Sequence, residues 1–298
     1  MQLKLVLMLA LAMLLRQTES DAPAYRTSAG AEAIACGLTG NCAPGSTDEA
    51  FMAMATTAEF GTLHEVPAPL TLANPLGAMT LFGCADGQPG QGYLIKAKMP
   101  SNKYLIVIQE WWGLNDHIKQ EADKYFEALG GQVNVLAVDL YDGKVAGTVD
   151  SAQKLIRAAL GSKRKEAILQ GALELAGTGS QVYTVGWCFG GMMSLQTAIM
   201  GGAQVKGCIM YYGTPEKDAG KLAKISCDVL GIFGTQDRGI PNESVDAFAS
   251  QMKAAGKNFT LVRYDAVHAF ANPSNPGYNK QFGDDAFEKS IAFLKERL

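Results

Sequence analysis

The stretch Val182-Tyr-Thr-Val-Gly186-Trp-Cys188-Phe-Gly190-Gly191-Met192 decides the fold. An apolar, β-branched run leads into Gly-x-Cys-x-Gly-Gly, and a helical pattern follows over residues 189–200. Glycines two residues before and two residues after Cys188 let a strand and a helix approach closely around a sharp turn. The stretch therefore predicts a buried strand, a tight turn that lifts the Cys188 side chain clear of a sheet, and a helix.

Short apolar segments alternate with amphipathic segments from about Met79 to the end of the chain. The predicted strands are Tyr93–Ala97, Tyr104–Gln109, Asn134–Leu140, Val182–Gly186, Val205–Tyr211, Asp228–Phe233 and Thr260–Tyr264. The predicted helices are 116–129, 150–160, 164–176, 189–200, 243–255 and 285–297. Near-continuous apolar strands that alternate with helices indicate an α/β fold with a mainly parallel sheet covered on both faces. Ligands bind such sheets beyond the carboxyl ends of the strands.

The turn at Cys188 has the nucleophile-elbow pattern, with Cys in place of Ser. In this arrangement the acid and then the histidine follow the nucleophile along the chain. Asp237 comes after the predicted strand 228–233, and His268 comes after the predicted strand 260–264. A neutral imidazole at His268 can take the thiol proton, and Asp237 can fix its tautomer and stabilise its charge. We predict these three residues to be catalytic.

Each of the three residues also has a structural interpretation. Cys188 can be a buried cysteine in a glycine-rich turn, Asp237 a turn or helix-cap residue, and His268 a loop histidine. Their occurrence together, in the required order and after three separate strands, favours catalysis.

The backbone of two residues is placed to stabilise an oxyanion. The Phe189 N–H lies at the start of a helix, and the Trp111 N–H follows an early strand, where a second donor is expected. Glu110 ends that strand and is followed by Trp111 and Trp112. A carboxylate beside two indoles in a cleft should resist ionisation or need a partner. The alternative is a strand-end glutamate that faces solvent.

Six stretches in this order resemble the dienelactone hydrolase (carboxymethylenebutenolidase) family of the α/β-hydrolase superfamily. The stretches are Ile106–Asn115, Asp139–Tyr141, Gly186–Gly191, Tyr211–Gly213, Gly234–Asp237 and His268–Phe270, within residues 79–298. The resemblance implies an α/β-hydrolase fold and cleavage of esters or lactones through a thioester acyl-enzyme. It implies Cys188 as nucleophile, His268 as base, Asp237 as orienting acid, and Glu110 as a carboxylate that holds or accepts the thiol proton. It implies no metal and no organic cofactor.

The resemblance also indicates where this chain departs from its family. The best-known members grip a substrate carboxylate with two arginines, one of them four residues after the catalytic histidine. That position is Asn272 here, and the only clear arginine of the segment after Asp139–Tyr141 is Arg157. We predict substrate contacts by Trp112, Tyr212, Phe270 and Asn272, and we expect neutral substrates to be preferred.

The first residues are typical of a targeting segment. Leu5–Leu15 is an unbroken apolar run that follows Lys4 and ends at Arg16. The run suits the core of a signal peptide and is too short to span a bilayer. Small residues at Ser20 and Ala22 predict cleavage after Ala22, with Ser20 as the alternative. Residues 1–22 thus predict a secreted or periplasmic protein, unless the run is an apolar helix folded into the protein.

Residues 23–78 are rich in Ala, Thr, Gly and Pro and show no sustained period. We interpret them as an extension that wraps the hydrolase domain (79–298) or links it to something else, with a short helix near Ala50–Ala55. Cys36 and Cys42 bracket a turn-rich loop that can close as a disulfide in an exported protein, or they are two unpaired thiols. Cys84, Cys208 and Cys227 lie in or beside predicted strands and are expected to pack as small hydrophobes.

Charge and composition exclude several other classes of protein. The net charge is −3 and no block of Lys and Arg occurs, so nucleic acid is not an expected partner. No later stretch predicts a membrane span, and the three histidines are too scattered along the sequence to indicate a zinc cluster. The expected partner is a small-molecule ester or lactone. Two other functions stay open: a non-catalytic binding protein on the same fold, and a thiol redox protein, which ranks last because no second cysteine adjoins Cys188.

Overall fold

The computed structural model describes residues 45–298. The predicted signal peptide and the Cys36–Cys42 pair lie outside these described residues. The strands are β1 (Ala78–Phe82), β2 (Gly90–Ile95), β3 (Lys103–Ile108), β4 (Asn134–Val138), β5 (Gln181–Trp187), β6 (Val205–Tyr211), β7 (Asp228–Gly234) and β8 (Phe259–Tyr264). They form one sheet in the order β1-β2-β4-β3-β5-β6-β7-β8. β1 and β2 pair antiparallel, β2 joins β4 antiparallel, and the other pairs are parallel.

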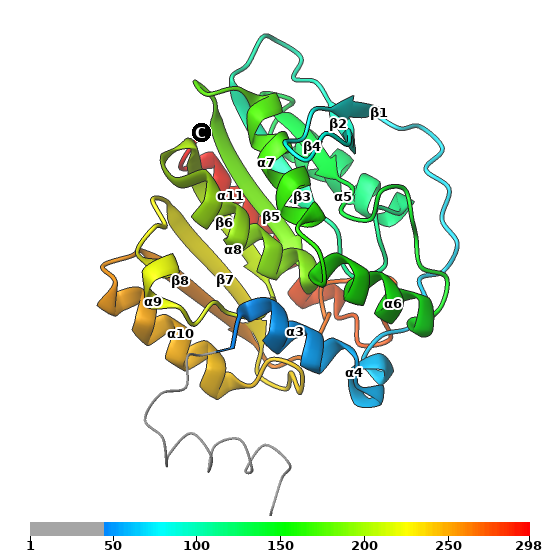
Figure 1. Ribbon diagram of the computed structural model, residues 1–298, viewed down its shortest axis with the longest axis vertical. Helices are drawn as coiled ribbons and strands as arrows, with labels where there is room; N and C mark the ends of the chain where they lie inside the picture. Colours follow the sequence, from blue (N-terminus) through cyan, green and yellow to red (C-terminus); the bar gives the residue numbers. More distant parts are fainter. Residues whose placement is uncertain (1–44) are drawn as a thin grey trace, which may run out of the picture. The chain divides into compact units, whose positions relative to one another are not determined.

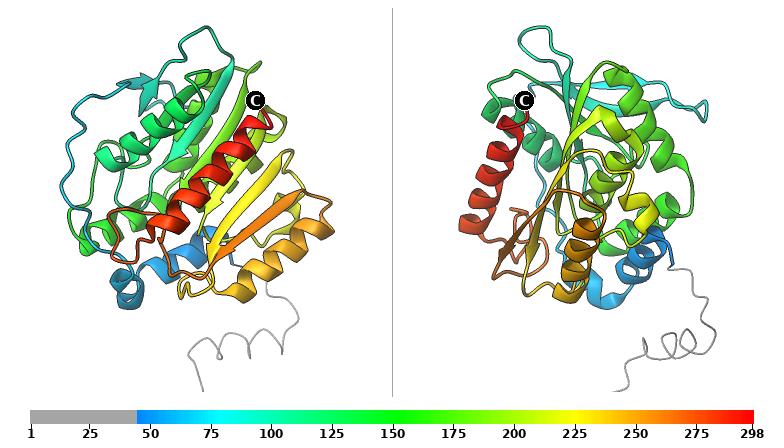
Figure 2. Two further views of the ribbon diagram at one scale, coloured as in Figure 1. Left: turned by 180° about the vertical axis from the view of Figure 1, so that it is seen from behind. Right: turned by 90° about the vertical axis from the view of Figure 1, so that its left-hand side faces the viewer.

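Helices cover both faces of this sheet. They are α3 (Thr47–Ala55), α4 (Ala58–Thr62), α5 (Asp116–Ala128), α6 (Val149–Leu160), α7 (Arg164–Ala176), α8 (Phe189–Gly201), α9 (Ala219–Leu222), α10 (Asn242–Ala254) and α11 (Lys280–Lys295), with a 3₁₀ turn at Gly202–Gln204. α5 and α11 lie on one face, and α7 and α8 lie on the other (Figures 1 and 2). The expected α/β-hydrolase fold, a mainly parallel sheet between two helical layers, is confirmed. None of the helices in residues 45–298 is long and apolar enough to cross a membrane.

The predicted elements match the observed ones closely in the centre of the sheet and less well at its edge. β6 has the predicted bounds, and the predicted strand over 182–186 is β5. The edge strand β1 was not predicted, because its side chains are mostly exposed and show no buried apolar run. The last helix begins at Lys280, earlier than predicted, because the Asn279 side chain caps it by accepting a hydrogen bond from the Phe282 N–H.

The turn at Cys188 has the geometry that its glycines predict. Cys188 has φ +55° and ψ −115°, between the end of β5 and the first residue of α8. A Cβ on Gly186 would lie 2.2 Å from the Gly190 carbonyl oxygen, and a Cβ on Gly190 would lie 2.2 Å from the Ile108 carbonyl oxygen. Neither position can carry a side chain without moving backbone. The central strand, the helix and the neighbouring strand β3 therefore fix the place of the sulfur.

Residues 45–66 lie across the carboxyl end of the sheet, and we call them the capping segment. They contain α3 and α4, which Figure 1 draws in blue near the ends of β5 and β7. Ser46 and Thr57 cap the two helices by accepting hydrogen bonds from backbone N–H groups. Phe51 and Phe60 are buried, and the Phe51 ring lies 5.7 Å from the ring of Phe189. The described part of the extension therefore shares a core with the hydrolase domain.

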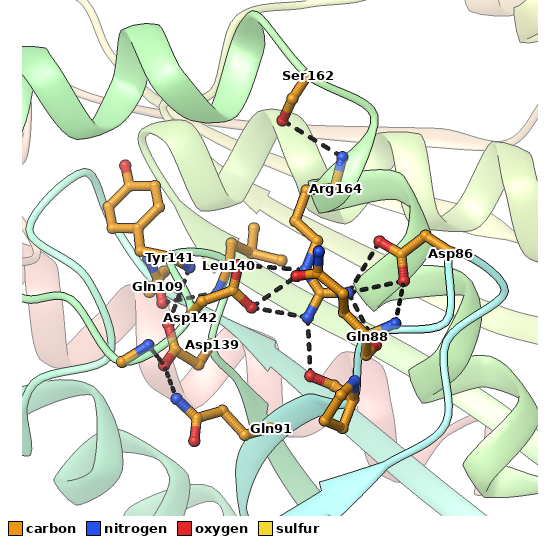
Figure 3. Close-up of polar contacts among 12 residues, drawn as sticks. Asp86, Gln88, Gln91, Gln109, Asp139, Leu140, Tyr141, Asp142, Ser162 and Arg164 are labelled. Carbon is orange, nitrogen blue, oxygen red and sulfur yellow. Dashed lines mark hydrogen bonds and ion pairs between the residues drawn. The ribbon is translucent and has the colours of Figure 1, made fainter.

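A guanidinium joins two loops at the edge of the sheet (Figure 3). Arg164, the first residue of α7, pairs with Asp142 at 2.7 Å and with Asp86 at 2.9 Å. It also donates to the Pro89 carbonyl oxygen at 2.8 Å. Asp139 orders the same turn by accepting from the Tyr141 N–H at 2.9 Å. Together these contacts tie the loop before β2 to the turn after β4.

Candidate active site

His268 and Asp237 form a buried pair. The Nδ1 atom of His268 lies 2.7 Å from Oδ2 of Asp237, and both side chains are inaccessible to solvent. The other carboxylate oxygen accepts from the N–H groups of Gly239 and Ile240, at 2.8 and 2.9 Å. Because a carboxylate only accepts hydrogen bonds, Nδ1 of His268 carries a proton. The other ring nitrogen, Nε2, can therefore exchange a proton with a group in the site.

Cys188 faces this pair. Its Sγ lies within 4.8 Å of a ring nitrogen of His268. Burial raises the pKa of the Cys188 thiol, while the neighbouring His268 acts in the opposite sense. Burial by itself would lower the pKa of His268, but Asp237 and Cys188 raise it well above its usual range. Sulfur and imidazole therefore hold their proton to higher pH than the free groups would.

Glu110 is buried beside the same cysteine. It is 4% exposed, so the interpretation of a solvent-facing glutamate is wrong. Its Oε2 accepts from the Asn272 side-chain amide at 2.8 Å. Burial raises the pKa of Glu110 to about 7, although His268 and Asn272 oppose the change. The carboxylate therefore changes charge close to neutral pH.

Of the two predicted oxyanion donors, the Phe189 N–H lies next to the sulfur in the fold. The Phe189 N–H begins α8, and it acts to lower the pKa of the Cys188 thiol. Trp111 follows β3 and is fully buried. Backbone N–H groups at such positions can stabilise negative charge that develops on a bound carbonyl.

The predicted substrate contacts divide into two groups. Trp112 and Asn272 line a surface cleft. Tyr212 and Phe270 are buried, their rings 5.6 Å apart, and Phe270 packs further against Tyr264. Tyr212 has φ +35°, a strained backbone conformation of the kind found at functional sites. Phe270 thus packs against Tyr212 in the interior, whereas Trp112 and Asn272 line the cleft.

The cleft opens between α5 and the loop after His268. Its lining residues are Pro67, Glu110, Trp112, Gly113, Asn115, His117, Ile118, Gln120, Glu121, Trp187, Ala271, Asn272, Pro273 and Ser274. Two of these described residues are acidic, and none is a lysine or an arginine. The Asn272 amide is engaged with Glu110. Arg157 lies on α6 and is exposed.

Sequence reasoning did not identify His64 as part of this site. Its Nε2 lies 3.9 Å from Sγ of Cys188, and its ring lies 5.2 Å from the ring of His268. The Nδ1 atom of His64 lies 3.0 Å from the Phe60 carbonyl oxygen, which can only accept, so Nδ1 is the donor. Burial lowers the pKa of His64 to about 3, so the ring is neutral. The residues around His64 in the sequence carry no signal of this contact, because it depends on how α4 packs on the distant sheet.

The expectation that the histidines are too scattered for a cluster is wrong for two of them. One atom each of His64, Cys188 and His268 lies within 4.8 Å of the others, and all three residues are buried. The third histidine, His117, lies apart on α5, where its Nε2 is 2.8 Å from the Ala68 carbonyl oxygen. The fold unites the two histidines because the capping segment folds back over the sheet.

The capping segment also covers the sulfur. Phe60 contacts the rings of Trp111 and His268, at 5.4 and 5.5 Å between centroids. His64 packs on Trp111 at 4.4 Å. Cys188 itself has no exposed surface. A substrate must therefore reach the sulfur by way of the cleft at Glu110 and Trp112, or after the capping segment shifts.

Comparison with known proteins agrees with this geometry. Residues 91–298 match the model of the dienelactone hydrolase family. The protein usf of Aquifex pyrophilus is 27% identical over 235 residues, covering 75% of this chain and all of that protein. A candidate carboxymethylenebutenolidase of Salmonella typhimurium is 25% identical over 260 residues, covering 77% of this chain and 92% of that protein.

A solved structure shows the same fold. The dienelactone hydrolase-like promiscuous phosphotriesterase P91, from metagenomic libraries, superposes with a TM-score of 0.64 at 23% identity. The match covers 74% of this chain and 99% of that one. With its fold and with a family match over more than half of its length, this chain belongs to the dienelactone hydrolase family of α/β-hydrolases.

Proposed function

We propose that this hydrolase cleaves small-molecule esters or lactones through a thioester formed on Cys188. The observation that carries the proposal is the 2.7 Å contact between His268 and Asp237, with the other side of the imidazole turned toward a cysteine at a strained elbow. A buried, oriented base beside a fixed sulfur is the arrangement that nucleophilic catalysis requires.

The residues suggest the following reaction. The Cys188 sulfur attacks the carbonyl carbon while His268 takes the thiol proton. The N–H groups of Phe189 and Trp111 stabilise the oxyanion. His268 then gives its proton to the departing alkoxide, which leaves as an alcohol or as the opened arm of a lactone. Water, deprotonated by the same imidazole, attacks the thioester and releases the acid and the thiol.

Glu110 has a supporting part in this proposal. With its pKa near 7, it changes charge close to neutral pH and so alters the field at the thiol. Ionised Glu110 opposes formation of the thiolate, because like charges repel. The Asn272 amide keeps the carboxylate in place.

A scan of chromogenic short-chain esters and lactones tests the function. Cys188→Ala should abolish hydrolysis, and His268→Ala should lower it on the order of a thousandfold or more. Cys84→Ala is the matched control, because Cys84 is a free, half-buried cysteine of the described chain far from the elbow in sequence. Wild-type turnover by Cys188→Ala would show that another group is the nucleophile. Absence of turnover on every substrate would favour a binding protein on the same fold.

A further inference from the structure

The capping segment brings a second histidine to the nucleophile, and the hydrolase mechanism does not use it. His64 Nε2, the inner nitrogen of His268 and Cys188 Sγ all lie within 4.8 Å of one another. The described chain gives the buried Nε2 of His268 no hydrogen-bond partner. A buried nitrogen without a partner is costly, and it is most often explained by a function or by a ligand.

The outer nitrogen of each ring is already fixed. Nδ1 of His64 donates to the Phe60 carbonyl oxygen, and Nδ1 of His268 donates to the Asp237 carboxylate. The neutral ring of His64 therefore turns an Nε2 lone pair toward the sulfur, and His268 does the same once its Nε2 has lost its proton. Metal-binding histidines show this same pattern, in which a carbonyl or a carboxylate holds the outer N–H and fixes the tautomer.

The chemistry of the three atoms selects the ion. One thiolate and two imidazoles suit borderline-soft Zn²⁺, whereas Mg²⁺ and Ca²⁺ prefer oxygen ligands. A tetrahedral zinc ion, with bonds of about 2.0–2.3 Å, needs ligand atoms roughly 3.5 Å apart. The His64–Cys188 separation of 3.9 Å is close to that requirement.

We propose that His64 Nε2, Cys188 Sγ and His268 Nε2 form a site for a zinc-class divalent cation, which holds the nucleophile inactive. Binding forms one metal–sulfur and two metal–nitrogen bonds. It releases to solvent the thiol proton and, where His268 is protonated, its Nε2 proton. Because Cys188 and His268 are also the proposed nucleophile and base, metal binding and hydrolysis exclude each other.

Cobalt titration of the chelator-treated full chain tests this site. Co²⁺ should bind and give a thiolate-to-cobalt charge-transfer band together with the visible bands of a tetrahedral ion, and Zn²⁺ should displace it. Mg²⁺ should neither bind nor compete. Absence of the band in the wild-type chain overturns the proposal, and so does a band that persists in Cys188→Ala.

The histidine that is new to the site is tested with a matched pair of variants. His64→Gln should weaken Co²⁺ binding by about a hundredfold. Loss of a residue that merely hydrogen-bonds to a metal ligand weakens binding by up to that factor, and His64 is itself a proposed ligand. His117→Gln, which changes a histidine outside the cluster, should bind as the wild type does. Equal affinity in His64→Gln overturns the role of His64, and far-UV circular dichroism checks that the variant folds.

The proposed hydrolase function and the proposed metal site can be contradicted independently of each other. Hydrolysis is assayed in the presence of chelator, where the metal site plays no part. If the chain binds Co²⁺ through Cys188 but cleaves no ester, the proposed function is contradicted and the metal site is supported. If the chain cleaves esters but shows no cobalt–thiolate band, only the proposed metal site is contradicted.

Discussion

The Nε2 atom of His64 lies 3.9 Å from the Sγ atom of Cys188, although 124 positions separate the two residues in the sequence. The contact exists because α3 and α4 fold over the carboxyl end of the sheet and bury Phe51 and Phe60 there. The region before the family match at residue 91 therefore supplies part of the wall of the candidate active site. Its packing should control how easily the sulfur is reached.

Phe60→Ala should loosen the capping segment. Phe60 is 2% exposed and packs on Phe51, His64, Trp111 and His268. Removal of a buried phenyl ring costs about 3 kcal/mol of unfolding free energy. If Cys188 is alkylated through local opening of this segment, its alkylation by iodoacetamide should speed up about tenfold or more.

Phe248→Ala is the control for this variant. Phe248 is equally buried but lies on α10, where it packs against Phe259. It should lose similar stability in urea without the same gain in alkylation of Cys188. Equal acceleration in the two variants would mean that the sulfur becomes reachable by global unfolding, and not by opening of the capping segment.

Glu110→Gln should remove a pH dependence of stability. The pKa of Glu110 is about 7 in the folded chain, raised by burial, whereas an unfolded glutamate titrates near 4.5. Between these values the folded state keeps a proton that the unfolded state has lost, so stability falls as pH rises through this window. The wild type should lose roughly 3 kcal/mol more than the variant between pH 4.5 and 7.

Urea unfolding at several pH values measures this difference. Gln at this position can still accept from the Asn272 amide, so the packing of the pair should survive. Glu288→Gln, which changes an exposed glutamate on α11, should follow the wild-type curve. Parallel curves for the wild type and Glu110→Gln would show that Glu110 is ionised across the whole window.

Arg164→Ala should destabilise the edge of the sheet. The Arg164 side chain is only 14% exposed and joins Asp86, Asp142 and the Pro89 carbonyl oxygen. Loss of these charge-assisted hydrogen bonds should cost about 2 kcal/mol of unfolding free energy. Arg157→Ala, which changes an exposed arginine on α6, should stay within about 0.5 kcal/mol of the wild type. A similar small change in both variants would show that solvent screens the ion pairs of Arg164.

The central sheet could be predicted from the sequence because its signals are local. Gly186 is required by a contact within the turn itself and Gly190 by the close approach of strand β3, and both show as glycines at fixed spacing from Cys188. The buried strands show as continuous apolar runs. The positions of Asp237 and His268 after their strands follow from the order of the elements. The same reasoning would locate the acid and the histidine in any chain with this order of strands and helices.

The role of the capping segment could not be predicted in this way. Nothing near His64 in the sequence shows that its ring meets Cys188, because that contact depends on how Phe51 and Phe60 pack on a distant sheet. The bond between Asn272 and Glu110 spans 162 positions and has no local signal either. The prediction that Asn272 contacts substrate rests on its place four residues after His268, and that place does not show that its amide is engaged with Glu110.

Neutral substrates should be turned over better than matched substrates with a free carboxylate near the scissile bond. The described residues of the cleft include Glu110 and Glu121 and offer no lysine or arginine. Lys124 does not line the cleft, and its ammonium pairs with Glu121 at 2.5 Å. A carboxylate in this cleft would lose hydration without gaining a cationic partner. The comparison needs one neutral and one anionic lactone of equal size, with kcat/KM measured for each.

A charge-reversal pair at Gln120 makes this prediction specific. Gln120 lines the cleft on α5 and has no part in the proposed reaction. Gln120→Lys should shift the kcat/KM ratio toward the anionic lactone by about fivefold, which corresponds to about 1 kcal/mol across partly screened solvent. Gln120→Glu keeps the shape of the side chain and adds a negative charge, so it should shift the ratio toward the neutral lactone. High salt should shrink both shifts, because the added charge is partly exposed. A wild-type preference for the anion, unchanged by either variant, would mean that the substrate carboxylate is bound elsewhere than in this cleft.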